Sequence, residues 1–240
     1  MRIILPLILF FCCADLSTGQ SLTLDMGEGG SMVGRVVLMF ALITIISLAP
    51  SILVMMTSFT RIVVALSFLR SALGLQQSPP NIVLISLAMF LTFFIMAPTL
   101  EKAYDDGLAP YIAEQIDEEE AFSRTAAPLR EFMLKQVREK DLQLFMDIAK
   151  IESVETPEET PLRTLIPAFM ISELKKAFEI GFLLFLPFII IDMIVASILM
   201  SMGMMMVPPI MIALPFKLIF FVLIDGWHMI AGSLVKGFGL

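Results

Sequence analysis

The chain has 240 residues, of which 58% are hydrophobic and only 16% charged, and its mean hydropathy is +0.91. This composition lies well above the apolar fraction of soluble domains and indicates a membrane protein. The net charge of −7 argues against binding of nucleic acid, which needs a basic surface. The only cysteines are the neighbours Cys12 and Cys13, which excludes a disulfide framework or a cysteine metal site elsewhere. Because the chain has one histidine and no recognisable catalytic set, metal-ligand cluster or phosphate loop, we expect neither an enzyme nor a bound cofactor.

Residues 1–20 have the pattern of a secretory signal peptide. A positive residue at position 2 precedes an apolar core that is too short to span a bilayer. Small residues then give two candidate cleavage sites, near residue 14 and near residues 19–20. An uncleaved first anchor is the alternative. The polar, glycine-rich residues 21–35 are expected to form a flexible leader.

Four apolar runs follow, each long enough for a membrane-length helix. They cover residues 36–60, 81–100, 180–206 and 210–235. Turn residues near Gly74 and at 78–81 join the first two runs into a hairpin, residues 36–100. Residues 164–240 form the second hairpin. Prolines within the runs predict kinks, so the expected fold is an all-α integral membrane protein with two long kinked hairpins.

A hydrophilic insertion, residues 101–163, separates the two hairpins. Between residues 128 and 150 the apolar positions recur at helical spacing, which predicts one amphipathic helix. The Glu-, Pro- and Thr-rich residues 152–161 read as a loop. Such a small insertion has little core of its own, so we expect it to pack against another part of the protein.

The positive charges of the first hairpin predict its orientation. Arg61 and Arg70 are the only charges between the first two apolar runs, and short positive connections stay in the cytoplasm. The insertion is then periplasmic, in agreement with the signal peptide. Nine residues apart, the two arginines lie on opposite faces of a helix, so they are not expected to serve one ligand.

Three charged residues, Asp192, Lys217 and Asp225, lie within the last two apolar runs. Charges are costly in lipid and there mark either an ion relay or pairing between helices or subunits. Lys217 and Asp225 are eight residues apart, too far to bond within one helix. Glu173 is the predicted partner of Lys217.

The tip of the second hairpin, residues 200–209, has the sequence MSMGMMMVPP. Gly203 allows unusual backbone angles, and Pro208 and Pro209 cannot continue the preceding helix. Methionine side chains are flexible and re-pack easily. The loop is therefore either packed against other protein, with methionine as filler, or a deformable apolar seal.

Several stretches in order along the chain resemble the FliP family of the flagellar type III export gate. They are residues 48–70 (LAPSILVMMTSFTRIVVALSFLR), 90–98 (FLTFFIMAP), 167–175 (PAFMISELK), 185–197 (FLPFIIIDMIVAS), 200–209, 214–218 (LPFKL) and 225–227 (DGW). None falls between residues 104 and 163. The signal peptide and the long insertion resemble the flagellar branch more than the virulence-system relatives.

The resemblance implies an assembly. Members of the family form a pentamer that joins FliQ and FliR in a helical assembly around a central pore, with other membrane proteins of the export apparatus nearby. Bent helices place much of that complex on the periplasmic side of the bacterial inner membrane, within the flagellar basal body. By position, Met204, Met205 and Met206 correspond to the loop that projects into the pore and seals it.

Two functions follow as hypotheses. The first is a pore-forming subunit that passes unfolded flagellar proteins across the inner membrane, with the methionine loop as its gasket. The alternative is an ion-coupled secondary transporter or channel that uses Asp192, Lys217 and Asp225. Inverted repeats would support a transporter, and none is recognisable in this sequence.

Overall fold

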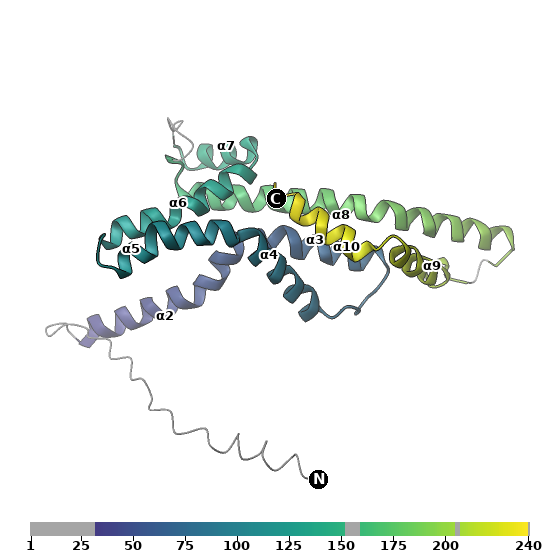
Figure 1. Ribbon diagram of the computed structural model, residues 1–240. Helices are drawn as coiled ribbons and strands as arrows, with labels where there is room; N and C mark the ends of the chain where they lie inside the picture. The colour runs from purple at the N-terminus through teal and green to yellow at the C-terminus, as the bar shows by residue number, and fades with distance from the viewer. Residues whose placement is uncertain (1–31, 152–158, 205–206, 240) are drawn as a thin grey trace, which may run out of the picture. The chain divides into compact units, whose positions relative to one another are not determined.

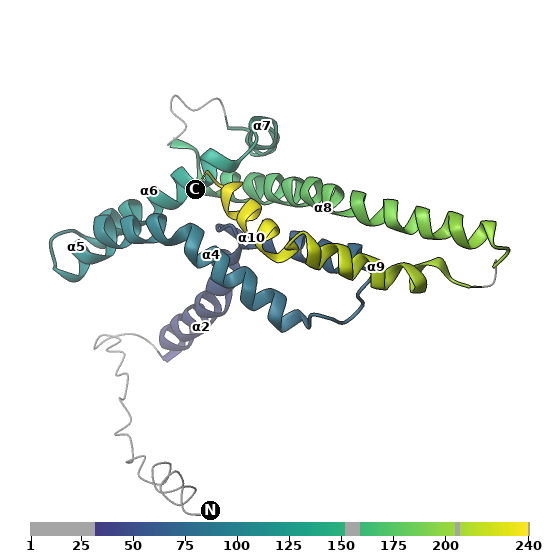
Figure 2. The same cartoon turned by 45° about the vertical axis from the view of Figure 1, so that its right-hand side comes forward.

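The computed structural model describes residues 32–151, 159–204 and 207–239. Within these ranges the chain forms helices and no strand, which confirms the all-α prediction for the described residues. The chain divides into two compact units, Met1–Leu48 and Ala49–Leu240. The apolar helix α2 (Met32–Met55) begins in the first unit and ends in the second. The other helices belong to the second unit (Figures 1 and 2).

Helix α3 (Phe59–Ala72) lies at the centre of the second unit. Ile62, Ala65, Leu66 and Leu69 recur at helical spacing and are at most 1% exposed, so one face of α3 is wholly buried. This face packs against α8 and α4. The segment with both arginines is therefore a core helix, and the turn between the first two apolar runs is confined to the residues after it.

Helix α4 (Asn81–Ala103) continues through a π-helical turn, η1 (Tyr104–Leu108), into the short α5 (Ala109–Ile112). The turn before α4 lies where it was predicted, with Gly74 at φ +78° and α4 beginning directly after Pro80. Within η1, Gly107 allows close packing on α6, since a Cβ there would overlap Thr125.

Two helices, α6 (Glu118–Gln136) and α7 (Glu139–Ile148), occupy the part of the insertion for which one amphipathic helix was predicted, residues 128–150. Extended backbone at residues 137 and 138 separates them. Asp117 caps α6 by accepting a hydrogen bond from the Glu120 N–H at 2.8 Å. Met133 of α6 packs with Leu165 and Phe169 of α8, so the insertion does share its core with another part of the chain.

Helix α8 (Leu162–Ser201) has 40 residues and is about 60 Å long. Its first half packs against α3, α6 and α7, and its apolar second half pairs with α9 (Pro209–Leu223) as a hairpin (Figure 1). Helix α10 (Gly226–Lys236) follows α9 after a bend of 63°. The fourth apolar run is thus broken at Asp225, whose φ is +50°, and is not one continuous helix.

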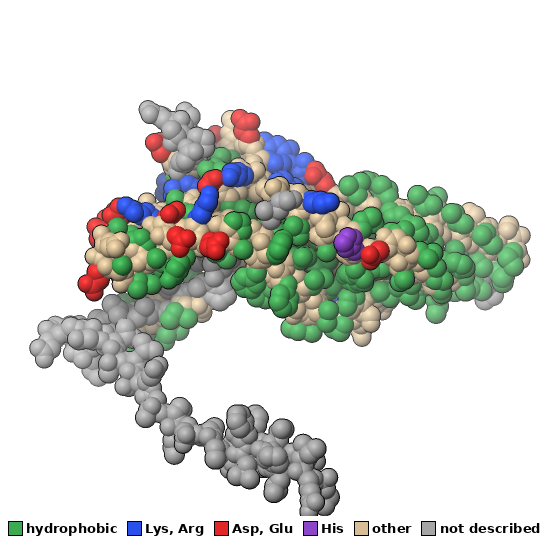
Figure 3. Space-filling view, in the orientation of Figure 1, with side chains coloured by type: hydrophobic (Ala, Val, Ile, Leu, Met, Phe, Trp, Pro, Cys, Tyr) green, Lys and Arg blue, Asp and Glu red, His purple; other side chains and the backbone are tan. Residues whose placement is uncertain are grey.

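The apolar helices give the described chain its membrane character. The stretches Asn81–Ile112 and Leu162–Ser201 are long and apolar enough to cross a membrane, and the bent pair α9–α10 is a third candidate span. The described helices therefore support two or three spans, fewer than the four predicted runs. In Figure 3, charged side chains gather over α5–α7, whereas hydrophobic side chains cover α9 and the far half of α8.

Candidate functional site

A buried arginine stands at the start of the core helix α3. Arg61 is 2% exposed and Glu173, on α8, is fully buried. The Arg61 Nε donates to Glu173 Oε2 at 2.8 Å, and Arg61 Nη2 pairs with Glu173 Oε1. This bidentate geometry is the strongest form of the arginine–carboxylate contact. It fixes the rotation and height of α3 against α8.

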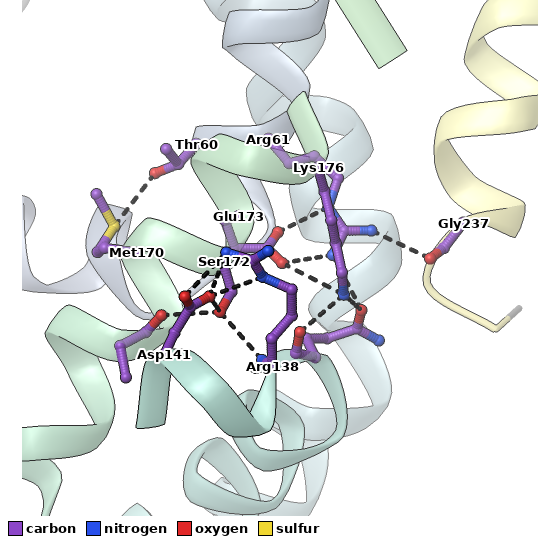
Figure 4. A network of polar contacts seen from close by, with 11 residues as sticks. Thr60, Arg61, Arg138, Asp141, Met170, Ser172, Glu173, Lys176 and Gly237 are labelled. Carbon is purple, nitrogen blue, oxygen red and sulfur yellow. Dashed lines mark hydrogen bonds and ion pairs between the residues drawn. The ribbon is translucent and has the colours of Figure 1, made fainter. Parts of the chain in front are cut away.

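Two further segments converge on the same guanidinium group (Figure 4). Arg61 Nη2 also donates to Gln136 Oε1 at 2.9 Å, at the end of α6. Arg61 Nη1 donates to the Gly237 carbonyl at 3.1 Å, and the Phe238 ring centre lies 3.7 Å from the guanidinium carbon. One side chain therefore joins α3, α6, α8 and the segment after α10.

Lys176 extends this cluster by one turn of α8. Its Nζ donates to the Gln136 carbonyl at 2.7 Å and to the Gln136 side chain at 3.0 Å. The same ammonium is 4.0 Å from Glu173 Oε1. The last turn of α6 is thus held by two cations, one from α3 and one from α8.

A second polar cluster joins α7 to α8 (Figure 4). The Ser172 hydroxyl donates to Asp141 Oδ2 at 2.6 Å and accepts from the Arg138 N–H at 3.0 Å. Arg138 Nε and Nη2 also donate to the Asp141 carboxylate. Burial raises the pKa of Asp141, but the hydrogen bonds from Ser172 and Arg138 outweigh it and leave that pKa below its usual value. Asp141 therefore remains a charged acceptor.

A third ion pair lies in the hairpin of α8 and α9. Lys217 Nζ donates to Asp192 Oδ2 at 2.7 Å and to the Ala72 carbonyl, at the end of α3, at 3.3 Å. The Lys217 side chain is 6% exposed, whereas that of Asp192 is 32% exposed. The pair therefore connects the hairpin to the core and reaches its surface at Asp192.

The predicted pair between Lys217 and Glu173 is wrong. Both residues form ion pairs between helices, but Glu173 pairs with Arg61 and Lys217 pairs with Asp192. The reason is distance along α8, because Asp192 comes 19 residues after Glu173, which is about 28 Å. A lysine on α9 that reaches one of these carboxylates cannot reach the other.

The remaining predicted charges lie elsewhere. Arg70 closes the turn between α3 and α4 by donating to Asn81 Oδ1 at 2.5 Å and to the Pro79 carbonyl at 3.3 Å. As predicted, it does not share a partner with Arg61. Asp225 is exposed at the bend between α9 and α10, and no ion pair to it occurs among residues 32–151, 159–204 and 207–239. Its pairing with another subunit stays a prediction.

The methionine-rich tip joins α8 to α9. Gly203 has φ +75°, and the N–H groups of Gly203 and Met204 donate to the carbonyls of Met200 and Leu199, so the end of α8 is closed as in a glycine C-cap. The described tip methionines, Met200, Met202 and Met204, are 59%, 62% and 40% exposed. Met205 and Met206 lie outside the described residues.

Sequence reasoning did not identify the partner of Glu173. Arg61 was interpreted as a charge that sets orientation, and Gln136, Ser172 and Phe238 were not singled out. One signal was present, because Arg61 is followed by apolar residues at 62, 65, 66 and 69, the pattern of a helix with a buried face. An arginine next to such a face needs a buried acceptor.

The chemistry of these clusters is that of fixed joints between helices. Their charged groups pair with one another, although Nη1 of Arg138 and Oδ1 of Asp192 are buried without a hydrogen-bond partner. In the part of the chain that the structure describes, no three His, Cys, Asp or Glu side chains are grouped to hold a metal ion. The hairpin tip, in contrast, is exposed and uncharged. The polar clusters thus connect α3, α6, α7 and the first half of α8, and the apolar hairpin of α8 and α9 extends from them to the methionines at its tip.

Known proteins share this sequence over nearly its whole length. The model of the FliP family matches residues 42–234. Proteins named flagellar biosynthetic protein FliP are similar to the chain: that of Caulobacter vibrioides is 58% identical over 219 residues, covering 91% of this chain and 82% of the relative. That of Bacillus subtilis is 54% identical (86% and 93% covered), and that of Agrobacterium fabrum is 47% identical (99% of both). The chain therefore belongs to the FliP family.

Proposed function

We propose that this chain is a pore-forming subunit of the flagellar type III export gate in the bacterial inner membrane. Two observations support the proposal: its family, whose similar members are named flagellar biosynthetic proteins, and its long apolar helices. In this role the protein performs no chemistry. It provides a path for unfolded flagellar proteins.

The methionine-rich hairpin tip carries the proposal. Three described methionines at the tip are exposed, although burying them would remove apolar surface from water. A pore has to stop ions at rest and yield to polypeptides of varied shape. Flexible thioether side chains suit that task, because they form a dry constriction and re-pack around different side chains. We assign the gasket to Met204, Met205 and Met206.

The partners in this proposal are further copies of the chain, as a pentamer, together with FliQ, FliR and other membrane proteins of the export apparatus. The support is the exposed apolar surface of α8 outside the tip. Phe182, Leu183 and Met193 are 63–65% exposed, and surfaces of this kind mark contact with protein or lipid. The flagellar basal body is the proposed location.

Changing Met204, Met205 and Met206 together to alanine is expected to leave assembly intact and to make the membrane leaky to ions and small solutes. Alanine removes the side-chain volume that closes the constriction, while the ion pairs of the base are untouched. The measurement is small-solute entry, or conductance, in cells that produce the complete gate with the altered loop.

The matched control is the triple leucine variant, which keeps apolar bulk and should seal better than alanine. Valine, which is β-branched, should close the pore but re-pack less easily around a passing polypeptide, because its χ1 angle is restricted. An assembled alanine gate that leaks no more than wild type would contradict the gasket and leave methionine as packing filler.

The proposal also places the insertion, residues 101–163, in the periplasm. Glu119 is exposed in the first turn of α6, so Glu119→Cys should react with a membrane-impermeant thiol reagent added to cells whose outer membrane is permeable. The extent of labelling of Glu119→Cys is compared with that of Lys236→Cys, at the end of α10. Labelling of position 119 only after the inner membrane is opened would reverse the orientation.

No observation favours the alternative, an ion-coupled transporter or channel. Lys217 and Asp192 pair with each other, and Asp225 lies beyond them at the bend that ends α9. The three charges therefore do not form one pathway in the described chain.

A further inference from the structure

One face of α4 lines two hollows that follow each other along the helix. The first, of about 450 Å³, lies between α4 and α10, which contact each other (Figure 2). The second, of about 200 Å³, lies between α4, α6 and Phe238. Leu91, Ile95, Pro98 and Lys102 of α4 line them in turn and share one helical stripe. We call the two hollows together the α4 groove.

The chemistry of the α4 groove changes along its length. Between α4 and α10 its walls are apolar side chains, with a single lysine, Lys236, at the edge. The other end carries Lys102 and Lys135 against one acid, Glu131. Lys135 pairs with Glu131 at 2.6 Å, and in residues 32–151, 159–204 and 207–239 no ion pair involves Lys102 or Lys236. One end is therefore apolar and the other has surplus positive charge.

The dimensions fit a chain-like amphiphile. From Leu91 to Lys102 is eleven residues along α4, or about 16 Å. Gly232 lines the hollow beside α10. A Cβ at Gly232 would meet no atom within 4 Å, so this space is not filled by the protein itself.

We propose that the α4 groove binds an anionic phospholipid. One acyl chain lies between α4 and α10, against Leu91, Phe94 and Val235. The anionic headgroup lies toward the cationic end, where Lys102 is placed, and Lys236 at the edge of the apolar hollow adds to the positive charge. Lysine suits this place because its stem lies along apolar surface while its ammonium group reaches the phosphate. Clusters of lysine beside apolar helices recognise anionic lipid in the same way.

The polarity of the groove favours lipid over a helix from another protein subunit. A packed helix would need small or complementary apolar contacts along the whole groove, whereas this one ends in cations. The bilayer is the source we assign to the ligand. The inference does not depend on the export function, since it needs only a membrane.

The test uses the full chain in its membrane complex, purified in mild detergent and supplied with palmitoyl-oleoyl phosphatidylglycerol or the matching phosphatidylcholine. Native mass spectrometry counts the lipids retained per chain. We expect wild type to retain phosphatidylglycerol and little phosphatidylcholine. Gly232→Leu should lower phosphatidylglycerol retention by about tenfold, because the added side chain occupies the place of several acyl CH₂ groups.

A second variant tests the lysines without adding a side chain to α10, as Gly232→Leu does. Lys102→Gln with Lys236→Gln changes two exposed side chains and should abolish the preference for phosphatidylglycerol over phosphatidylcholine. Two controls lie outside the groove: Ser233→Leu, which adds the same side chain one residue further along α10, and Lys140→Gln, which removes an exposed lysine from α7. Both should retain lipid as wild type does.

Three results would overturn the proposal. One is equal retention of both lipids by wild type. Another is undiminished retention of phosphatidylglycerol by Gly232→Leu and by the double glutamine variant. The third is loss of a partner subunit from the Gly232→Leu complex with unchanged lipid content, which would assign the α4 groove to a protein helix.

Discussion

Replacing Arg61 with methionine is expected to destabilise the folded chain by about 3–5 kcal/mol, because the change removes the bidentate partner of the buried Glu173 carboxylate and leaves only the Lys176 ammonium, 4.0 Å away. Glu173 is 0% exposed, so water cannot replace the lost contacts. The Gln136 side chain and the Gly237 carbonyl lose the same donor. The contacts that connect α3, α6, α8 and the segment after α10 through Arg61 should all be lost together.

The measurement is the amount of assembled complex on a native gel and its thermal transition in detergent. Arg70→Met is the matched control on the same helix, because the Arg70 side chain donates its hydrogen bonds to Asn81 and Pro79 at the turn before α4 and not to the buried cluster. We expect that control to assemble almost as wild type does. Arg61→Lys should recover little, since an ammonium group cannot make the bidentate contact.

The double variant Arg61→Met with Glu173→Met separates a stranded charge from lost packing. Replacing both members of a buried pair by apolar residues is often close to neutral, so the double variant should assemble better than Arg61→Met alone. If the double variant is the weaker of the two, the cost lies in Gln136 and Gly237, and a stranded Glu173 charge is not the cause.

Replacing Lys217 with methionine is expected to destabilise the hairpin of α8 and α9 by about 2–4 kcal/mol. This is below the effect at Arg61, because Asp192 is partly exposed and water can hydrate it in part. Asp192→Asn should be at least as costly. It leaves the deeply buried Lys217 ammonium with only an amide and the Ala72 carbonyl as acceptors. The readout is again assembled complex and its thermal transition.

The pairing is tested by a charge exchange. Lys217→Asp combined with Asp192→Lys should recover part of the assembly lost in each single variant. Lys217→Glu combined with Glu173→Lys should recover none, since Glu173 belongs to Arg61. Lys175→Met is the control for removal of a lysine, because Lys175 forms an exposed pair with Glu179, and such pairs contribute little. Normal assembly of Lys217→Met with loss of ion flux alone would support the transporter alternative.

Two ion pairs between helices and the hydrogen bond from Ser172 to Asp141 connect the small insertion and the long apolar hairpin to the core. Arg61 and Ser172 tie α6 and α7 to the first half of α8, and Lys217 ties α9 to the end of α3 and to the second half of α8. Each joint crosses from one helix to another.

Local sequence alone determined several features. The apolar runs predicted a helical membrane protein, because hydropathy is a sum over neighbouring residues. Gly74 and the prolines at 79 and 80 predicted the first turn, since glycine and proline act on their own backbone angles. The methionine-rich tip was predicted in the same way, from Gly203 and the proline pair that follows.

Tertiary structure decided the features that depend on distant residues. Arg61 and Glu173 are 112 positions apart, and Lys217 and Asp192 are 25 apart. No rule of sequence spacing connects such pairs. A carboxylate in an apolar helix therefore predicts that a cation lies nearby, but it does not identify that cation. Which cation it meets is settled by how far along α8 each neighbouring helix crosses.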